Sequence, residues 1–300
     1  MKGFLFPLIA LASALAACGP QIDDLEAGES GRVAEIVDGD TLVLDTGLRV
    51  TLTGIEAPFG DRAFAREARA GLERLALHRP VRLAYGGEHR VPPRSPVGPR
   101  DAAAATPAVA VEKAAPPGEA APAPTAPGET ALAQVYVQSE GGRWIWVQQA
   151  MLVEGLARVR TRKENFARAD DLLAAEAQAR AERRGLWALR DYRILTDAAA
   201  VEQASTLPNR CGEGPFLIVE GRVRQVSAND ERVYLNFGED YRTDFTIGIY
   251  GEDVADWSGR GPAFASYEGQ RVRVRGRAAN RGGPLICADH PEQIEILTAS

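Results

Sequence analysis

A forty-residue stretch that cannot build a core divides this 300-residue chain. Residues 91–130 contain ten prolines and twelve alanines, and almost no large apolar side chains. This composition cannot bury enough apolar surface to offset the entropy that a chain loses on ordering. We therefore expect residues 91–130 to be a disordered, partly extended insertion between folded parts. Because 45% of the whole chain is apolar, the flanking parts have enough material for real cores.

The N-terminus has the pattern of an export signal. Lys2 supplies a positive charge, and the apolar run from Phe4 to Leu15 is too short to cross a bilayer. The run ends in Leu15-Ala16-Ala17-Cys18, which resembles the lipobox of bacterial lipoproteins. That resemblance implies an acylated Cys18 and an exported protein held by the lipid bilayer of the cell envelope, facing the periplasm or the exterior. The alternative is a simple secretory signal with an incidental cysteine.

Two of the three cysteines would remain after such processing. They are Cys211 and Cys287. An even pair in an exported protein favours a disulfide, because that compartment is oxidising. Two buried free thiols are the alternative, since a sequence does not give their separation.

Strand and helix patterns account for the residues on both sides of the insertion. Strands are predicted over 32–37, 41–44, 49–55, 81–85 and 132–137. Helices are predicted over 61–77 with Asp61 as N-cap, from the strand 144–147 onward to 156, and over 165–184. The last third is strand-rich, with strands expected over 216–226, 233–237, 245–250, 271–277 and 294–297. Five short strands in this length suit a small barrel or sandwich.

These patterns give a complete division of the chain. We expect a signal peptide at 1–18, a tether at 19–30, a folded domain at 31–188, a linker at 189–209 and a small β domain at 210–300. The net charge of −6 argues against a purely electrostatic nucleic-acid binder. Any phosphate binding would therefore depend on local basic patches.

Four motifs in the first domain follow one another in the order of a known family. They are Val37-Asp38-Gly39-Asp40-Thr41-Leu42, Gly54-Ile55-Glu56-Ala57-Pro58, Leu152 to Val159, and Glu176 to Arg180 with Gly185-Leu186-Trp187. Together they resemble the staphylococcal nuclease (thermonuclease-like) family over residues 31–90 and 131–188. The resemblance implies a mainly β fold with helices, in which an OB-type five-stranded barrel forms the first domain. It also implies Ca²⁺-dependent cleavage of DNA and RNA. The segments Tyr234–Gly238 and Asp244–Thr246 resemble, more loosely, a second OB-type module, so a second small β barrel is expected.

The resemblance implies a calcium site in the first domain. Its ligands would be Asp40, Glu56 and the carbonyl of Ala57, with Asp38 nearby. Calcium takes about six to eight oxygens, so this set with water would make a weak site. A structural turn is the alternative, because Asp-Gly-Asp-Thr is good turn chemistry by itself.

The catalytic positions of the family are replaced in this sequence. Thr51 and Thr130 stand at the two arginine positions, and Phe59 stands at the position of the glutamate that aims the attacking water. Loss of one preorganised charge stabiliser costs about 10²–10³ in rate, although such losses do not simply add. The resemblance therefore implies an impaired nuclease, unless nearby arginines such as Arg49 or Arg62 compensate.

One strand of the second domain carries four arginines on one face. They are Arg271, Arg273, Arg275 and Arg277, at alternating positions. This face could bind phosphate or anionic lipid. The alternative is a solvated face whose arginines pair with Glu220, Glu239 or Asp244 on neighbouring strands.

Three functions remain open on the sequence alone. The favoured one is a membrane-anchored, thermonuclease-like lipoprotein, impaired in catalysis, that binds nucleic acid or a protein partner at the cell envelope. The second is an active Ca²⁺-dependent nuclease that cleaves DNA and RNA with substitute residues. The third is a purely structural envelope protein that binds neither nucleic acid nor metal.

Overall fold

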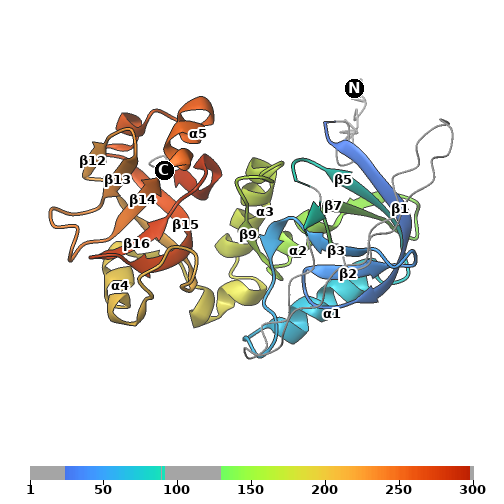
Figure 1. The fold of residues 1–300 in the computed structure, drawn as a ribbon. Helices are drawn as coiled ribbons and strands as arrows, with labels where there is room; N and C mark the ends of the chain where they lie inside the picture. Colours follow the sequence, from blue (N-terminus) through green and yellow to red (C-terminus); the bar gives the residue numbers. More distant parts are fainter. Residues whose placement is uncertain (1–23, 89, 92–129, 298–300) are drawn as a thin grey trace, which may run out of the picture.

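The computed structural model describes residues 24–88, 90–91 and 130–297. The predicted signal peptide with Cys18, most of the tether, and residues 92–129 of the Ala/Pro-rich insertion lie outside the described residues. Within the described part, no helix is both long and apolar enough to cross a membrane. The described residues build two β-rich domains, with the first on the right of Figure 1 and the second on the left.

The first domain is a closed five-stranded barrel, as expected. Its strands are β1 (Glu26–Ile36), β2 (Thr41–Leu44), β3 (Arg49–Leu52), β5 (Pro80–Tyr85) and β7 (Thr130–Gln138). They follow the order β3-β2-β1-β5-β7, and a parallel β3–β7 ladder closes the circle. β7 is buried along almost its whole length because it pairs on both sides. Shorter strands extend this core: β6 (Arg90–Val91), β8 (Trp144–Trp146), and the separate pair β4 (Gly54–Glu56) and β9 (Arg158–Arg160).

Three helices and one 3₁₀ turn complete the first domain. They are α1 (Ala65–Ala76), α2 (Val147–Val153), α3 (Ala169–Ala181) and η1 (Gly185–Ala188). Two glycines of the family-like motifs meet where η1 follows α3. Gly155 and Gly185 both have positive φ, and a Cβ on either would lie within 2.3 Å of the backbone on the other side. This close approach lets Leu186 N–H donate to the Gly155 carbonyl at 2.9 Å.

The second domain is an eight-stranded sheet with two helices beside it, α4 (Asp197–Val201) and α5 (Glu252–Arg260). Its order is β10-β11-β15-β16-β14-β13-β12, with β17 beside β15. The strands are β10 (Leu195–Thr196), β11 (Phe216–Arg222), β12 (Gln225–Ala228), β13 (Arg232–Asn236), β14 (Thr246–Tyr250), β15 (Arg271–Asn280), β16 (Pro284–Cys287) and β17 (Ile294–Ile296). Only Val223 and Arg224 separate β11 from β12, so one bent segment pairs with β15 at its start and with β13 at its end. This arrangement resembles a barrel, and the second OB-type module stays a prediction.

Several predicted boundaries differ from the structure for local reasons. The predicted tether overlaps β1, which begins at Glu26 because Glu26 and Ala27 already pair with β5. Helix α1 begins at Ala65 rather than after Asp61, since Phe64 has a left-handed backbone with φ 72°. Helix α3 likewise begins after Arg168, whose φ is 65°. Thr130, placed by the sequence at the edge of the insertion, lies in β7 and pairs with Arg49.

The predicted linker also contains ordered structure. It holds the 3₁₀ turns η2 (Arg190–Tyr192) and η3 (Ala204–Thr206), strand β10 and helix α4 (Asp197–Val201). β10 pairs in parallel with β11, so this segment belongs to the second domain. The sequence analysis also missed β16, α5 (Glu252–Arg260) and the turns η4 (Phe264–Tyr267) and η5 (Pro291–Gln293).

The two domains share a packed interface. Leu186 and Trp187 of the first domain pack with Phe216 and Ile218 of β11 in a small apolar cluster. Figure 1 places α3 and β9 between the first barrel and the second sheet. The Thr161 hydroxyl lies 2.6 Å from Nε2 of His290, and both side chains are buried. The two domains are therefore held together by an apolar cluster and by a buried polar contact.

Candidate functional site

Asp40 closes a tight turn between β1 and β2. Its backbone N–H donates to Oδ1 of Asp38 at 3.1 Å, and the Thr41 hydroxyl donates to Oδ1 of Asp40 at 3.2 Å. The other oxygen of Asp40 accepts the N–H of Ala57 at 2.9 Å, which ties the turn to the end of β4. Gly39 is required between the two aspartates, because a Cβ there would lie 2.6 Å from the Cβ of Ala57. The Asp38-Gly39-Asp40-Thr41 segment thus forms a hydrogen-bonded turn, which is the alternative that the sequence left open.

The environment of Asp40 disfavours its charged form. Burial raises the pKa of Asp40 to about 7, and the neighbouring charge of Asp38 acts in the same direction. The Ala57 N–H opposes the rise without cancelling it. The protonated form of this carboxyl is therefore favoured up to a higher pH than that of an exposed aspartate.

Glu56 lies in β4 and faces arginines. Its Oε2 accepts from Nη2 of Arg158 at 2.9 Å, and its Oε1 accepts from Nη1 of Arg160 at 3.0 Å. Nη2 of Arg277, from the second domain, lies 3.9 Å from the same Oε1. The Glu56 side chain is only 5% exposed. Burial alone would raise the pKa of Glu56, but Arg158 and Arg160 outweigh it and hold the pKa below its usual value.

These residues do not fit a calcium centre as they are arranged. Both oxygens of Glu56 are already engaged by guanidinium groups, and both oxygens of Asp40 accept hydrogen bonds. A hard cation needs several free oxygens around one point. In the part of the chain that the structure describes, no cluster of three or more His, Cys, Asp or Glu side chains could hold a metal ion. The predicted ligand set of Asp40, Glu56 and Ala57 therefore lacks support from the geometry.

Two of the replaced catalytic positions, Thr51 and Phe59, lie in different surroundings. Thr51 lies in β3, opposite Thr41 of β2 and Leu132 of β7. Phe59 is 47% exposed, and the guanidinium of Arg62 lies 4.1 Å from the centre of its ring. Phe59 thus presents an apolar, half-exposed ring with a cation over it, where the family implies a carboxylate.

A cation-rich crevice lies between the two domains beside this region. It has a volume of about 630 Å³. Its charged lining residues are Asp61, Arg62, Arg158, Arg190, Asp191, Arg193 and Arg277. Five arginines against two aspartates leave a positive surplus. Burial, followed by the like charges of Arg160, Arg62 and Arg158, lowers the pKa of Arg277 from its ordinary value. The crevice therefore suits an anionic ligand.

The four arginines of β15 are mostly paired with carboxylates. Glu220 accepts from Arg271 at 3.2 Å and from Arg273 at 2.8 Å. Arg275 is buried against Glu176 and Glu295, and Arg277 donates to the Gly214 carbonyl at 2.9 Å. For Arg271 and Arg273 this matches the pairing with Glu220 that the sequence left open, and Arg277 alone reaches the crevice.

Cys211 and Cys287 are joined by a disulfide. Their Cα atoms lie 5.7 Å apart, and the bond closes a loop with a sequence separation of 76. It ties the segment before β11 to the end of β16, and so fixes the start of the second domain to its sheet.

Sequence reasoning missed the partners of Glu56. Arg158 belongs to the Leu152 to Val159 motif and Arg160 follows it directly, but the sequence pattern assigned no role to either side chain. Their alternation around buried Val159 was an available signal, because residues two apart in a strand share a face. Nothing local linked that face to Glu56, since the β4–β9 ladder joins residues about a hundred positions apart.

Comparison with known families agrees with the first domain. A family model described as staphylococcal nuclease homologue matches residues 127–189, which include β7, β8, α2, β9, α3 and η1. The first domain is thus staphylococcal nuclease-like in both sequence and barrel topology. No curated protein matches the chain.

Proposed function

We propose that this staphylococcal nuclease-like chain is a membrane-anchored lipoprotein of the cell envelope that binds nucleic acid without cleaving it. The observation that carries the proposal is the ion pairing of Glu56. Glu56 stands at a metal-ligand position of the family, but here it is ion-paired with Arg158 and Arg160. Arg277 of the second domain also lies near its carboxylate. Two of these arginines, Arg158 and Arg277, also line the crevice and contribute positive charge to it.

The loss of cleavage is supported by the chemistry of the replaced positions. A phosphate in the transition state carries extra negative charge, which the hydroxyls of Thr51 and Thr130 cannot neutralise. Phe59 cannot polarise or hold a water molecule. Glu56 and Asp40 are also engaged by protein groups, and among the described residues no cluster of three or more His, Cys, Asp or Glu side chains could hold a calcium ion instead.

The retained binding is supported by the arginine crevice. Arg62, Arg190 and Arg193 line it without an ion-pair partner within 4 Å among the described residues. Fixed arginines bind phosphate oxygens through paired N–H groups. A backbone phosphate is therefore the ligand group that fits this crevice best.

The location at the envelope is supported by the Leu15 to Cys18 string and by the disulfide. A lipid on Cys18 would hold the protein at a membrane. The Cys211–Cys287 bond suits an oxidising compartment outside the cytoplasm.

A nicking assay tests the loss of cleavage. Purified mature protein is incubated with supercoiled plasmid and with RNA, in Ca²⁺ and in chelator, beside an Asp40→Ala variant. We expect no cleavage above that of the variant under any condition. Robust Ca²⁺-dependent cleavage that Asp40→Ala abolishes would establish the active nuclease instead.

A binding assay tests the crevice. Fluorescence anisotropy with a labelled DNA duplex is measured for the unmodified protein and for the Arg62→Gln/Arg193→Gln double variant. We expect weaker binding by the variant and a salt dependence reduced by about one phosphate contact for each arginine. Arg271→Gln is the matched control, because it removes an exposed cation that is paired with Glu220. Equal losses in the control and the double variant would contradict a crevice-specific contact.

A further inference from the structure

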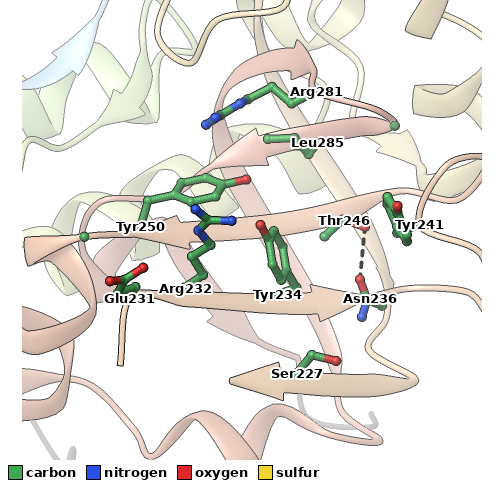
Figure 2. Close-up of a pocket in the computed structure, with 12 residues that line it drawn as sticks. Ser227, Glu231, Arg232, Tyr234, Asn236, Tyr241, Thr246, Tyr250, Arg281 and Leu285 are labelled. Carbon is green, nitrogen blue, oxygen red and sulfur yellow. Dashed lines mark hydrogen bonds between the residues drawn. The ribbon is translucent and has the colours of Figure 1, made fainter. Parts of the chain in front are cut away.

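A second cavity opens on the solvent face of the second domain, away from Glu56 and Asp40. It has a volume of about 840 Å³, which is in the range of small-ligand sites. Strands β12, β13, β14 and β16 form its floor, and the loops before β14 and β16 form its rim (Figure 2). Neither the family resemblance nor the proposed crevice accounts for this cavity.

Two tyrosines stand on the floor of this cavity. Tyr234 of β13 and Tyr250 of β14 have ring centres 5.8 Å apart, with the planes at 79°. Both rings are half-buried, and they project from the sheet on the same side in Figure 2. Tyr241 adds a third ring at the rim and is 51% exposed. Aromatic faces that remain open on a sheet can stack on planar ligand groups.

Two arginines lie beside these rings. Arg232 precedes Tyr234 by two residues on β13 and therefore shares its face. The guanidinium of Arg281 lies 4.9 Å from the centre of the Tyr250 ring. Among the described residues, neither arginine has a carboxylate within 4 Å, although Glu231 also lines the cavity. Their charge is thus available to a ligand, in contrast to that of Arg273 and Arg275 in β15.

Polar groups that could hydrogen-bond to a ligand complete the floor of the cavity. The Thr246 hydroxyl donates to Oδ1 of Asn236 at 3.2 Å, which fixes the orientation of the amide. The Asn236 amide nitrogen and the Ser227 hydroxyl face the same cavity (Figure 2). The cavity therefore combines aromatic rings, two arginines that have no carboxylate partner among the described residues, and a positioned amide on one sheet face.

We propose that this face binds single-stranded nucleic acid, with bases stacked on Tyr234 and Tyr250 and backbone phosphates on Arg232 and Arg281. The inference deepens the proposed function, on which it rests only for the class of ligand. A single strand is required, because the faces of paired and stacked bases are not accessible to a tyrosine ring. A neutral glycan could also stack on the rings, but it would leave both arginines without an anion.

Anisotropy of a labelled oligo-dT strand, measured with the full mature protein, tests the inference. The Tyr234→Ala/Tyr250→Ala variant is expected to bind the strand at least about ten-fold more weakly, because each substitution removes one base–aromatic stacking contact. Tyr234→Phe/Tyr250→Phe keeps both rings and should bind within about two-fold of the unmodified protein. Arg232→Gln and Arg281→Gln should each lower the salt slope by about one, whereas Arg271→Gln should leave it unchanged.

Thermal melts establish that each variant is folded. The Tyr234→Phe/Tyr250→Phe variant controls for a general loss of structure, because it keeps both rings. Unchanged affinity for oligo-dT in the Tyr234→Ala/Tyr250→Ala variant overturns the inference. It is also overturned if this variant loses as much affinity for the duplex as for oligo-dT. Preferential binding of an uncharged oligosaccharide that competes with oligo-dT also overturns it. These outcomes are distinct from failure of the proposed function, which would appear as plasmid cleavage or as duplex binding unaffected by Arg62→Gln/Arg193→Gln.

Discussion

Arg275 of β15 and Glu176 of α3 form an ion pair across the domain interface with both side chains almost fully buried. Their nearest oxygen and nitrogen lie 3.1 Å apart, and the side chains are 1% and 0% exposed. Arg275 also donates to the Val159 carbonyl at 3.2 Å, while Oε2 of Glu176 accepts the Val159 N–H at 2.5 Å. The backbone of Val159 in β9 is thus hydrogen-bonded to both members of the pair, and this connects β9 with both domains.

Removal of Arg275 should destabilise the protein strongly. Arg275→Met removes the buried guanidinium from Glu176, which keeps the longer ion pair with Arg180 at 3.4 Å. Removal of one member of a buried pair costs about 3–5 kcal/mol in comparable cases. Urea unfolding followed by tryptophan fluorescence measures the change. Arg271→Met is the control, because that exposed pair should contribute no more than about 1 kcal/mol. Equal, small effects of both substitutions would show that the interface pair is not important for stability.

Glu295 should make stability depend on pH in the acid range. Burial would raise the pKa of Glu295, but Arg275 and Arg273 outweigh it and hold the pKa below its ordinary value of 4.5. The folded state therefore binds fewer protons than the unfolded state, and this contribution is fully present above about pH 4.5. It is lost as the pH falls through the lower pKa of the folded protein.

Melting temperatures measured from pH 7 down to pH 3 check this dependence. Glu295→Gln should flatten the acid part of the curve as well as lower stability at neutral pH. Substitution of exposed Glu213 by Gln should leave the shape of the curve unchanged. An acid limb of identical slope in Glu295→Gln and the unmodified protein would rule out Glu295 as the titrating group.

The disulfide should stabilise the second domain. Replacing both Cys211 and Cys287 with serine should lower the free energy of unfolding by about 2–4 kcal/mol, because the bond constrains a long loop in the unfolded chain. Differential scanning calorimetry of the double variant, with and without reductant, gives the size of the loss. If reductant lowers the melting temperature of the double variant as much as that of the unmodified protein, the bond is not the cause.

The lipid anchor should depend on one residue outside the described part of the chain. Cys18→Ser removes the only acceptor for acylation in the Leu15 to Cys18 string, so the protein should leave the membrane fraction. Incorporation of a clickable fatty acid, followed by fractionation, measures both effects. Unchanged labelling and unchanged membrane association in Cys18→Ser would contradict the lipoprotein assignment.

The sequence by itself determined the first barrel. Turn residues and runs of β-branched and aliphatic side chains marked its strands, and the resemblance of the four motifs, among them those with Gly155 and Gly185, implied the barrel. The sequence also indicated the pairing of Cys211 with Cys287, because a pair of cysteines in an exported chain has few other uses. Boundaries were less well predicted. Phe64 and Arg168 begin their helices in left-handed conformations, which tertiary packing imposes and local propensity does not indicate.

Only the tertiary structure decided what surrounds each candidate site residue. The sequence matched Glu56 to a metal-ligand position, but the β4–β9 ladder brings Arg158 and Arg160 to it, and the domain interface adds Arg277. Likewise, Arg232 and Arg281 lie in segments with ordinary charge patterns, and only the folded sheet sets them beside Tyr234 and Tyr250 without carboxylates. A motif fixes which residue stands at a position, whereas the charge of a site is the sum over neighbours that are distant in sequence. For this reason the fold could be predicted from local patterns, and the chemistry of Glu56 could not.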